Sequence, residues 1–311
     1  MKIAIIGAGF CGLGLAYYLS QNSKHKITLV DQLGIGGGAS GIAAGLLHPY
    51  VGFKGRLNWR GHEALEETKK LLQYSNQNRL GIIRIPQSEE QWSLFQETAS
   101  QYDDVSICPI DHPGILAKEG ILIKSGVTVN CGQYLSSLWD VLQKRGCELD
   151  IQRVDSLDQL DDFDCRIICN GPLAKKLLGI RLKLIKGQLL RLEWPNSLPP
   201  LPHSVVSRKY IVMEEDMKSC WVGATYEHHF DHEAPDLECA KKDILSDLEK
   251  IMPDLAGAPI LDCQAGVRAF APDKRPFYKR VADSTWVFTG MGSKGLLYHS
   301  LVAQDLAQII S

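Results

Sequence analysis

The stretch Lys2-Ile3-Ala4-Ile5-Ile6-Gly7-Ala8-Gly9-Phe10-Cys11-Gly12 decides the fold of this chain. A short apolar run leads into Gly-x-Gly-x-x-Gly, the motif that joins a strand to a helix around a pyrophosphate. Gly7 allows the tight turn, Gly9 lets the backbone approach the phosphates, and Gly12 lets the helix pack closely on the strand. The helix that follows would direct its free N–H groups at the phosphates. The motif therefore predicts a Rossmann-like dinucleotide-binding domain.

An acidic residue follows the next predicted strand, which runs from Ile27 to Val30. This residue, Asp31, comes about twenty residues after the glycines, where a ribose-binding acid is expected. Its carboxylate would accept hydrogen bonds from ribose hydroxyls and repel a 2′-phosphate, so the cofactor is FAD or NAD rather than NADP. A signal peptide is the alternative for this apolar start. The glycine spacing and the strand that follows directly argue against it.

A run of small residues distinguishes between the two cofactors. Residues 36–45 read Gly-Gly-Gly-Ala-Ser-Gly-Ile-Ala-Ala-Gly, where an NAD-binding domain would place its third strand and helix. A flavin needs such a loop, because its flat ring requires close approach of the backbone. A flexible surface loop is the alternative, but Ala43, Ala44, Leu46 and Leu47 make the segment too apolar for a solvated linker. The segment favours FAD.

A second glycine-rich turn lies near the carboxyl end. The predicted strand Trp286–Thr289 meets Gly290-Met291-Gly292-Ser293-Lys294-Gly295-Leu296 and then opens a helix. Two such turns at opposite ends of one chain indicate a single large cofactor, held at both its dinucleotide and its reactive ring.

Composition narrows the class of protein. The 311 residues carry a net charge of −2, which gives no general attraction to nucleic acid or anionic membranes. No apolar stretch is long enough to span a membrane. The nine cysteines are scattered without a Cys-x-x-Cys pair, which is typical of reduced thiols. We expect a cytoplasmic protein with two interwoven lobes and no metal site, since His228, His229 and His232 lack a reliable ligand spacing.

These segments together resemble the D-amino-acid-oxidase-like (DAO) family of FAD-dependent oxidoreductases. Glycine oxidase, sarcosine oxidase and the flavin domain of the tRNA-modifying enzyme MnmC belong to this family. The flavin loop and the C-terminal turn are most similar to those of MnmC. The resemblance rests on six segments: 7–12 with Asp31, 38–45, Ile167–Gly171, Lys186–Gln188, Gly266–Arg268 with Pro272, Asp273 and Pro276, and Gly290–Leu296.

The resemblance implies an α/β fold, in which a Rossmann-like FAD-binding domain is interwoven with a smaller α+β substrate domain. The substrate domain is expected to be built on a mostly antiparallel sheet. Residues 1–84, 128–185 and 264–311 are assigned to the FAD-binding domain, and residues 85–127 and 186–263 to the substrate domain. The predicted helices cover 62–76, 131–145, 237–251 and 300–310.

The motifs and the resemblance together give a set of cofactor-binding residues. They are Gly7, Gly9, Phe10, Cys11, Gly12, Asp31, Gly38, Ala39, Ser40, Ala43, Ala44, Gly45, Leu46, Val154, Asn170, Gly171, Gly290, Gly292, Ser293, Lys294, Gly295 and Leu296. Covalent-flavin members of the family carry a cysteine seven residues before the motif Asp273. That position is Gly266 here, so we expect FAD to be bound non-covalently.

Four residues are candidates for the reaction itself. In similar enzymes the arginine that matches Arg268 holds the substrate carboxylate, a task that suits the planar guanidinium. Lys294 would place positive charge near the pyrimidine end of the flavin. His48 and Tyr226 could face the ring or the substrate. The alternatives are an inter-lobe ion pair for Arg268, a solvated loop lysine for Lys294 and a packing role for His48.

Two departures from the family pattern bear on these expectations. Residues 273–280 read Asp-Lys-Arg-Pro-Phe-Tyr-Lys-Arg, which is bulkier and more basic than the usual motif. Residues 148–164 are too few for the three-stranded meander that usually covers the FAD domain, so this element is expected to be reduced.

The implied reaction is oxidation of a carboxylated, glycine-like amine by hydride transfer to flavin N5. The substrate is either a small amino acid such as glycine or sarcosine, or the carboxymethylaminomethyl group on a tRNA wobble uridine. Two basic groups, Lys175, Lys176, Arg181, Lys183, Lys186 and Arg191, and Lys274, Arg275, Lys279 and Arg280, could contact RNA or form a solvated face. A non-catalytic, FAD-binding assembly factor would also fit the motifs, and an NAD-dependent dehydrogenase fits them less well because it would not use the C-terminal turn.

Overall fold

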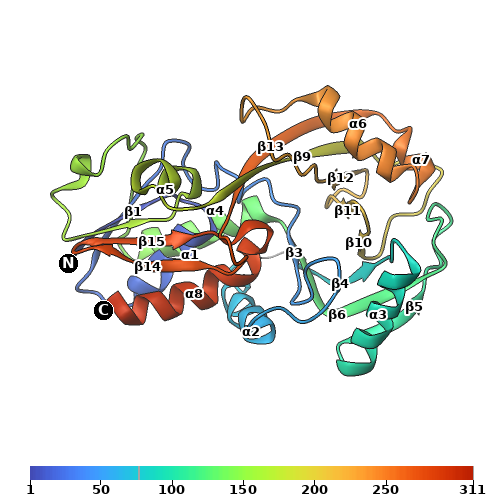
Figure 1. Cartoon of the computed structure of the whole chain (residues 1–311), viewed down its shortest axis with the longest axis horizontal. Coiled ribbons are helices and arrows are strands. Elements are labelled where there is room, and N and C mark those ends of the chain that lie inside the picture. The colour runs from blue at the N-terminus through green and yellow to red at the C-terminus, as the bar shows by residue number, and fades with distance from the viewer. Residues whose placement is uncertain (76–77, 311) are drawn as a thin grey trace.

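The computed structural model describes residues 1–75 and 78–310, which form two lobes (Figure 1). The first lobe contains a six-stranded sheet in the order β14-β15-β8-β1-β2-β7. Its strands are β1 (Lys2–Ile6), β2 (Lys26–Val30), β7 (Glu148–Asp150), β8 (Cys165–Ile168), β14 (Phe277–Ala282) and β15 (Thr285–Thr289). All neighbouring strands pair in parallel except β14 and β15.

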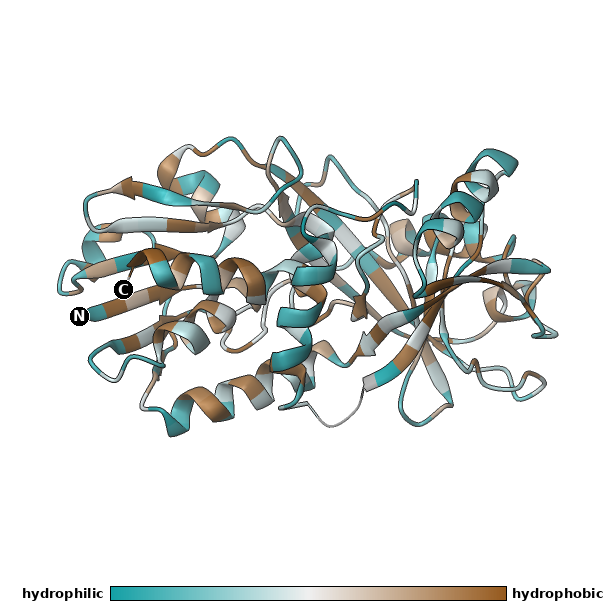
Figure 2. Ribbon diagram, turned by 90° about the horizontal axis from the view of Figure 1, so that it is seen from below, coloured by the Kyte–Doolittle hydropathy of each residue, from teal (hydrophilic) through white to brown (hydrophobic). Residues whose placement is uncertain are grey.

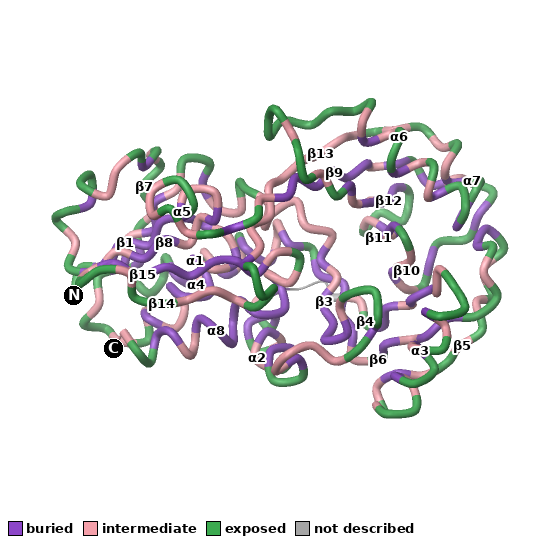
Figure 3. The backbone as a smooth tube through the Cα atoms, in the orientation of Figure 1, coloured by how far each residue is buried: buried purple, intermediate pink, exposed green. Residues whose placement is uncertain are grey.

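Helices cover both faces of this sheet, as a parallel sheet requires. On one face, α1 (Phe10–Leu19), α2 (Gly61–Leu72), α4 (Cys131–Lys144) and α8 (Gly295–Ile310) share an apolar core with Ile3 and Ile5. On the other face, α5 (Gly171–Leu178) and the short helix η1 (Leu157–Leu160) pack on Ala4 and Ile6. The central strands are consequently buried along their length (Figure 3).

The second lobe is built on a nine-stranded sheet in the order β13-β9-β12-β11-β10-β4-β6-β3, with β5 paired to β6. Its strands are β3 (Leu46–Leu47), β4 (Asn78–Arg84), β5 (Val105–Pro109), β6 (Glu119–Val129), β9 (Lys183–Glu193), β10 (Ser204–Val206), β11 (Tyr210–Met213), β12 (Ser219–Gly223) and β13 (Ile260–Phe270). Every pairing is antiparallel except that of β10 with β4.

The second sheet is covered by α3 (Glu89–Gln101), α6 (Leu237–Leu248) and α7 (Pro253–Ala256). Ile244 and Leu255 lie with strand residues in one apolar cluster, and Phe95 lies with β6 residues in another. Figure 2 shows apolar residues along the strands and polar residues on the outer helical faces. Each lobe therefore has its own core.

A long two-stranded ribbon joins the lobes. Strands β9 and β13 pair from Ile260↔Leu192 to Phe270↔Lys183. At the end of β13, Phe270 bridges Met291 and the Ala271 N–H donates to the Gly290 carbonyl at 3.0 Å. The ribbon thus carries residues of the substrate sheet directly to the C-terminal glycine turn.

The expected fold class is confirmed, whereas the expected domain boundaries need correction. Residues 78–84 are expected in the FAD-binding domain, but β4 pairs with β6 and β10 in the second sheet. Residues 264–270 are likewise expected there, but they continue β13. Both strands are apolar or small over much of their length, and sequence alone does not show which sheet their hydrogen bonds join.

Several element boundaries differ from those predicted. Helix α2 ends at Leu72 rather than at 76, a position outside the described residues, and α6 ends at Leu248 rather than at 251. Helix α8 begins at Gly295, five residues before the predicted start. In residues 148–164 there is one three-residue strand and one 3-10 turn, so the meander is reduced as expected. No helix within the described residues is long and apolar enough to cross a membrane.

Candidate active site

Two cavities meet between the lobes. The larger, of about 610 Å³, is lined by Gly7, Gly9, Asp31, Val154 and Asn170, among others. The smaller, of about 330 Å³, is lined by the flavin loop, the ribbon and the C-terminal turn. Six residues line both cavities, which makes them one continuous space: Ala39, Ser40, Gly171, Pro172, Gly266 and Val267.

Two helices begin at the larger cavity. Helix α1 starts at Phe10 with Gly9 as its N-cap, and α5 starts at Gly171, where the Asn170 side chain accepts a hydrogen bond from the Leu173 N–H at 3.0 Å. The first N–H groups of a helix lack partners within the helix and carry partial positive charge. The two helix starts therefore make this cavity suitable for a diphosphate.

The glycines of the first motif are required by close approaches. Gly7 has φ +112°, and a Cβ there would lie 2.9 Å from the Asn170 nitrogen. A Cβ on Gly9 would lie 2.6 Å from Ser40 Oγ, and one on Gly12 would lie 1.8 Å from the Gly7 oxygen. Gly12 lies outside the cavity linings, so its role is to pack the helix on the strand, as its motif position predicts.

Asp31 is fixed by backbone donors at the end of β2. Its two carboxylate oxygens accept hydrogen bonds from the Ala8 N–H at 2.9 Å and the Leu33 N–H at 2.8 Å. Each carboxylate oxygen can accept more than one hydrogen bond. Asp31 therefore retains acceptor capacity towards the larger cavity, as ribose binding requires.

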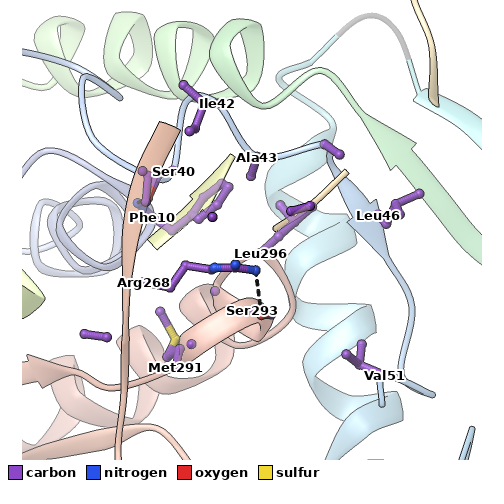
Figure 4. A pocket seen from close by; sticks show the side chains of 18 of the residues that line it. Phe10, Ser40, Ile42, Ala43, Leu46, Val51, Arg268, Met291, Ser293 and Leu296 are labelled. Atoms are coloured by element: carbon purple, nitrogen blue, oxygen red, sulfur yellow. Dashed lines mark hydrogen bonds between the residues drawn. The ribbon is translucent and has the colours of Figure 1, made fainter. Parts of the chain in front are cut away.

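The smaller cavity contains most of the predicted flavin-contacting residues (Figure 4). Residues 42–46 form one wall, Phe10 and Cys11 come from the start of α1, and Gly290, Gly292, Ser293, Gly295 and Leu296 form the opposite wall. Gly266, which takes the place of the cysteine found in covalent members of the family, has no room for a side chain. A Cβ there would lie 2.9 Å from the Ala39 Cα.

Arg268 projects from β13 into the smaller cavity (Figure 4). Its Nη2 donates to the Thr225 carbonyl at 2.9 Å and its Nη1 donates to Ser293 Oγ at 3.3 Å. Its buried Nε has no partner among the residues that the structure describes. Burial lowers the pKa of the guanidinium, which still stays charged at neutral pH. A guanidinium has five N–H donors, so Arg268 retains donors for a carboxylate.

A glycine opposite Arg268 provides the space for its side chain. A Cβ on Gly187 in β9 would lie 2.2 Å from Arg268 Nη2. The exposed ring of Tyr226 lies on another side, 5.3 Å from the guanidinium carbon. Tyr226 does not line the smaller cavity, but its ring contacts Arg268, which does.

A second arginine, which was not predicted from the sequence, also lines the smaller cavity. Arg84 at the end of β4 is only 6% exposed, and it donates to the carbonyls of Tyr50 and Gly52, each at 2.7 Å. Its guanidinium lies 4.7 Å from the centre of the Phe95 ring. The only sequence signal for Arg84 is that it is the one charged residue in the otherwise apolar run Leu80-Gly81-Ile82-Ile83-Arg84-Ile85.

His48 also lines the smaller cavity and is buried. Burial and the positive charge of Arg84 lower the pKa of its ring to about 3. The neutral ring accepts a hydrogen bond from the Tyr50 N–H on Nδ1, at 3.2 Å. Its proton therefore resides on Nε2, which makes His48 a neutral donor.

Lys294 lies in the C-terminal turn, as expected, but points away from the lining of the smaller cavity. Its neighbours Ser293 and Gly295 line the smaller cavity, but Lys294 does not. Its Nζ donates to the Lys274 carbonyl at 3.0 Å and lies over the Tyr298 ring. A direct role of Lys294 at the flavin thus stays a prediction.

The charges of the smaller cavity have one sign. Arg84 and Arg268 line it, and no aspartate, glutamate or lysine does so among the described residues. A buried cationic cavity of this kind favours an anionic ligand. Across the described residues, no group of three or more His, Cys, Asp or Glu side chains could hold a metal ion.

Comparison with known proteins agrees with this geometry. Residues 2–309 match the family described as FAD dependent oxidoreductase (DAO). The bifunctional tRNA 5-methylaminomethyl-2-thiouridine biosynthesis protein MnmC of Maricaulis maris is 25% identical over 98% of this chain and 51% of its own length. The bifunctional protein ThiO/ThiG of Nostoc sp. is 27% identical over 61% of this chain and 28% of its own length. The chain thus spans about half the length, or less, of these relatives.

Solved structures share the whole fold. Glycine oxidase from Geobacillus kaustophilus superposes with a TM-score of 0.83 at 18% identity, covering 99% of this chain and 94% of its own. Iminodiacetate oxidase from Chelativorans sp. BNC1 has a TM-score of 0.79 at 20% identity, covering 99% and 95%. With the family match over nearly all residues and the two joined cavities, the chain belongs to the DAO family of FAD-dependent oxidoreductases.

Proposed function

We propose that this chain oxidises a carboxylated, glycine-like amine with FAD held in the two joined cavities. The observation that carries the proposal is the lining of the smaller cavity, which contains two arginines and no acidic residue among the described residues. Arg268 has N–H donors left for a substrate carboxylate, and burial strengthens such a charge-assisted bond.

The chain's own residues would hold FAD along both cavities. Asp31 would bind the ribose, the starts of α1 and α5 would bind the diphosphate, and the small residues Ala43, Ala44 and Gly45 would lie against the ring. Bound FAD supplies the acceptor for a hydride from the carbon next to the amine. The residues around it orient that carbon and exclude water.

The cavity also favours the reactive form of the substrate. An amine gives up a hydride only when its nitrogen is neutral, and positive charges nearby lower the pKa of an amine. Arg84 and Arg268 would both act in this direction. His48, with a pKa of about 3, remains neutral and would not take the amine proton at neutral pH.

Among substrates of this class, we propose an N-substituted glycine carried by RNA, namely the carboxymethylaminomethyl group of a tRNA wobble uridine. Several relatives are named for tRNA 5-methylaminomethyl-2-thiouridine biosynthesis, and they cover nearly all of this chain. A small amino acid is the alternative, because the structural neighbours include a glycine oxidase. The intact Arg268 site argues against an FAD-binding factor without activity.

Flavin reduction tests the proposed function. The purified, FAD-loaded protein is mixed without oxygen with glycine, sarcosine or tRNA carrying the carboxymethylaminomethyl group, and the visible flavin absorbance is followed. We expect tRNA to bleach the flavin fastest. Bleaching only by glycine or sarcosine would show a small-amine oxidase, and no bleaching by any of them would refute amine oxidation.

The first prediction concerns the carboxylate site. Arg268→Ala removes a charged double hydrogen bond, so kcat/KM should fall about ten- to hundredfold, mainly through KM. Arg268→Lys keeps the charge but not the planar guanidinium, so its kcat/KM should lie between those of the unmodified chain and Arg268→Ala. The flavin content should stay unchanged in both. Steady-state kinetics that match the unmodified chain would remove Arg268 from the substrate site.

A further inference from the structure

An open, cationic hollow lies on the surface beside the active site. It has a volume of about 680 Å³ and is lined by Lys175, Arg181, Lys183, His228 and His229. These residues come from the end of α5, the start of β9 and the loop after β12. Asp231 is the only acidic residue among those that line it.

The charges of this hollow are available to a ligand. Lys175, Arg181 and Lys183 are exposed, and none of them takes part in the ion pairs found across the described residues. The neighbouring Lys176 is different, because it pairs with Asp155 at 3.3 Å. The basic segment 175–191 therefore does not act as one patch.

Lys186 and Arg191 are also excluded from the hollow. Lys186 is only 2% exposed, because it lies in the middle of β9, where residues 185–190 are all buried. Arg191 is half-buried further along the same strand, and its buried Nε has no partner within the described part of the chain. Of the six cations that are neighbours in the sequence, Lys175, Arg181 and Lys183 are therefore the three that line the hollow.

Aromatic side chains link the hollow to the substrate site. His228 of the hollow lies edge-on to the Tyr226 ring, with 5.2 Å between the ring centres. Tyr226 lies in turn over the guanidinium of Arg268, at 5.3 Å. The exposed Tyr226 thus stands between the cations of the hollow and the arginine that would hold the substrate carboxylate.

We propose that this hollow binds the phosphate groups of a single-stranded RNA segment whose modified base enters the smaller cavity. The proposal rests on the proposed function and names the surface that would hold such a substrate. Lysines and arginines around a groove bind RNA phosphates, and aromatic rings beside them stack on unpaired bases. The hollow is concave and has both features. A flat lipid surface would need a protruding cationic face instead.

Charge reversal tests the surface. The variant Lys175→Glu/Arg181→Glu/Lys183→Glu removes the three exposed cations. The matched control Lys26→Glu/Lys118→Glu/Lys144→Glu makes the same change in net charge at exposed lysines outside the hollow. Binding of a fluorescein-labelled RNA hairpin with a single-stranded loop is measured by anisotropy over a range of salt concentrations.

We expect the hollow variant to bind the hairpin at least tenfold more weakly and the control to bind much as the unmodified chain does. Three phosphate contacts on a single strand give a slope of log K against log salt of about −2, which the hollow variant should lose. Equal weakening in both variants would show only a general charge effect and would overturn the proposal. So would anionic phospholipid vesicles that compete with the hairpin more strongly than unlabelled hairpin does.

The outcome is separable from that of the proposed function. FAD content and anaerobic flavin reduction are measured on the same preparations. Hairpin binding that is lost only in the hollow variant supports the RNA surface even if no amine bleaches the flavin. If an amine bleaches the flavin but the hollow variant binds the hairpin as tightly as the unmodified chain, the RNA-binding surface is refuted and the proposed oxidase activity is supported.

Discussion

Arg84 fixes part of the active-site wall through hydrogen bonds to the backbone. It comes from the substrate sheet, yet its two donors bind the carbonyls of Tyr50 and Gly52, and Val51 and Gly52 line the smaller cavity. The Phe95 ring holds the guanidinium plane in place. This buried cation therefore positions the cavity wall as well as adding charge to the cavity.

A substitution at this residue separates the two effects. Arg84→Met keeps much of the volume but removes two charged hydrogen bonds, each worth about 1.5–3 kcal/mol. We expect lower thermal stability and a kcat/KM at least tenfold lower. Arg84→Lys, which keeps the charge, should recover the charge effect on KM but not the stability. Recovery of both by lysine would show that the hydrogen bonds to the wall are unimportant.

At the scale of elements, the sequence predicted the parts that have a short-range signature. The strand, glycines and acid of residues 2–31 follow the expected arrangement, because each role is fixed by neighbouring residues. The ribbon β9–β13 and the membership of β4 were not predicted, because their pairing joins residues far apart in the chain. Arg84 was missed for the same reason: it reaches the active site only through that pairing.

The ribbon makes a further prediction at this scale. Gly187 in β9 leaves room for the guanidinium that β13 carries, since a Cβ there would overlap Arg268 Nη2. Gly187→Ala should therefore raise KM as Arg268 variants do, while the flavin content is retained. Gly257→Ala is the control, because the nearest atom to a Cβ there is 4.0 Å away. A Gly187→Ala enzyme with unchanged KM would mean that Arg268 moves aside without loss.

At the scale of the whole molecule, two buried histidines, His48 and His299, couple stability to pH. His48 lies in the cavity wall, and His299 lies in α8, where it bonds to the Tyr134 hydroxyl at 2.7 Å and contacts the Phe10 ring. Burial lowers the pKa of His299 to about 4, and burial with the charge of Arg84 lowers that of His48 to about 3. Both rings are neutral in the folded protein, whereas unfolded histidine titrates near 6.5.

This difference fixes the direction of the pH dependence. Above about pH 6.5 both states carry neutral histidines and the stabilisation is complete. As the pH falls below 6.5, only the unfolded chain takes up the two protons, so the free energy of unfolding decreases. Each histidine contributes up to about 1.4 kcal/mol per pH unit down to its folded pKa.

Denaturant unfolding between pH 7 and about pH 4.5, at constant FAD saturation, measures this slope. His48→Asn and His299→Asn should each flatten the pH dependence by one proton, even where they lower the stability at pH 7. The two effects should add, because the two rings share no hydrogen-bond partner among the described residues. Variants with the same slope as the unmodified chain would place the acid sensitivity on the carboxylates instead, and His48 would then be free to take up a proton in the folded active site.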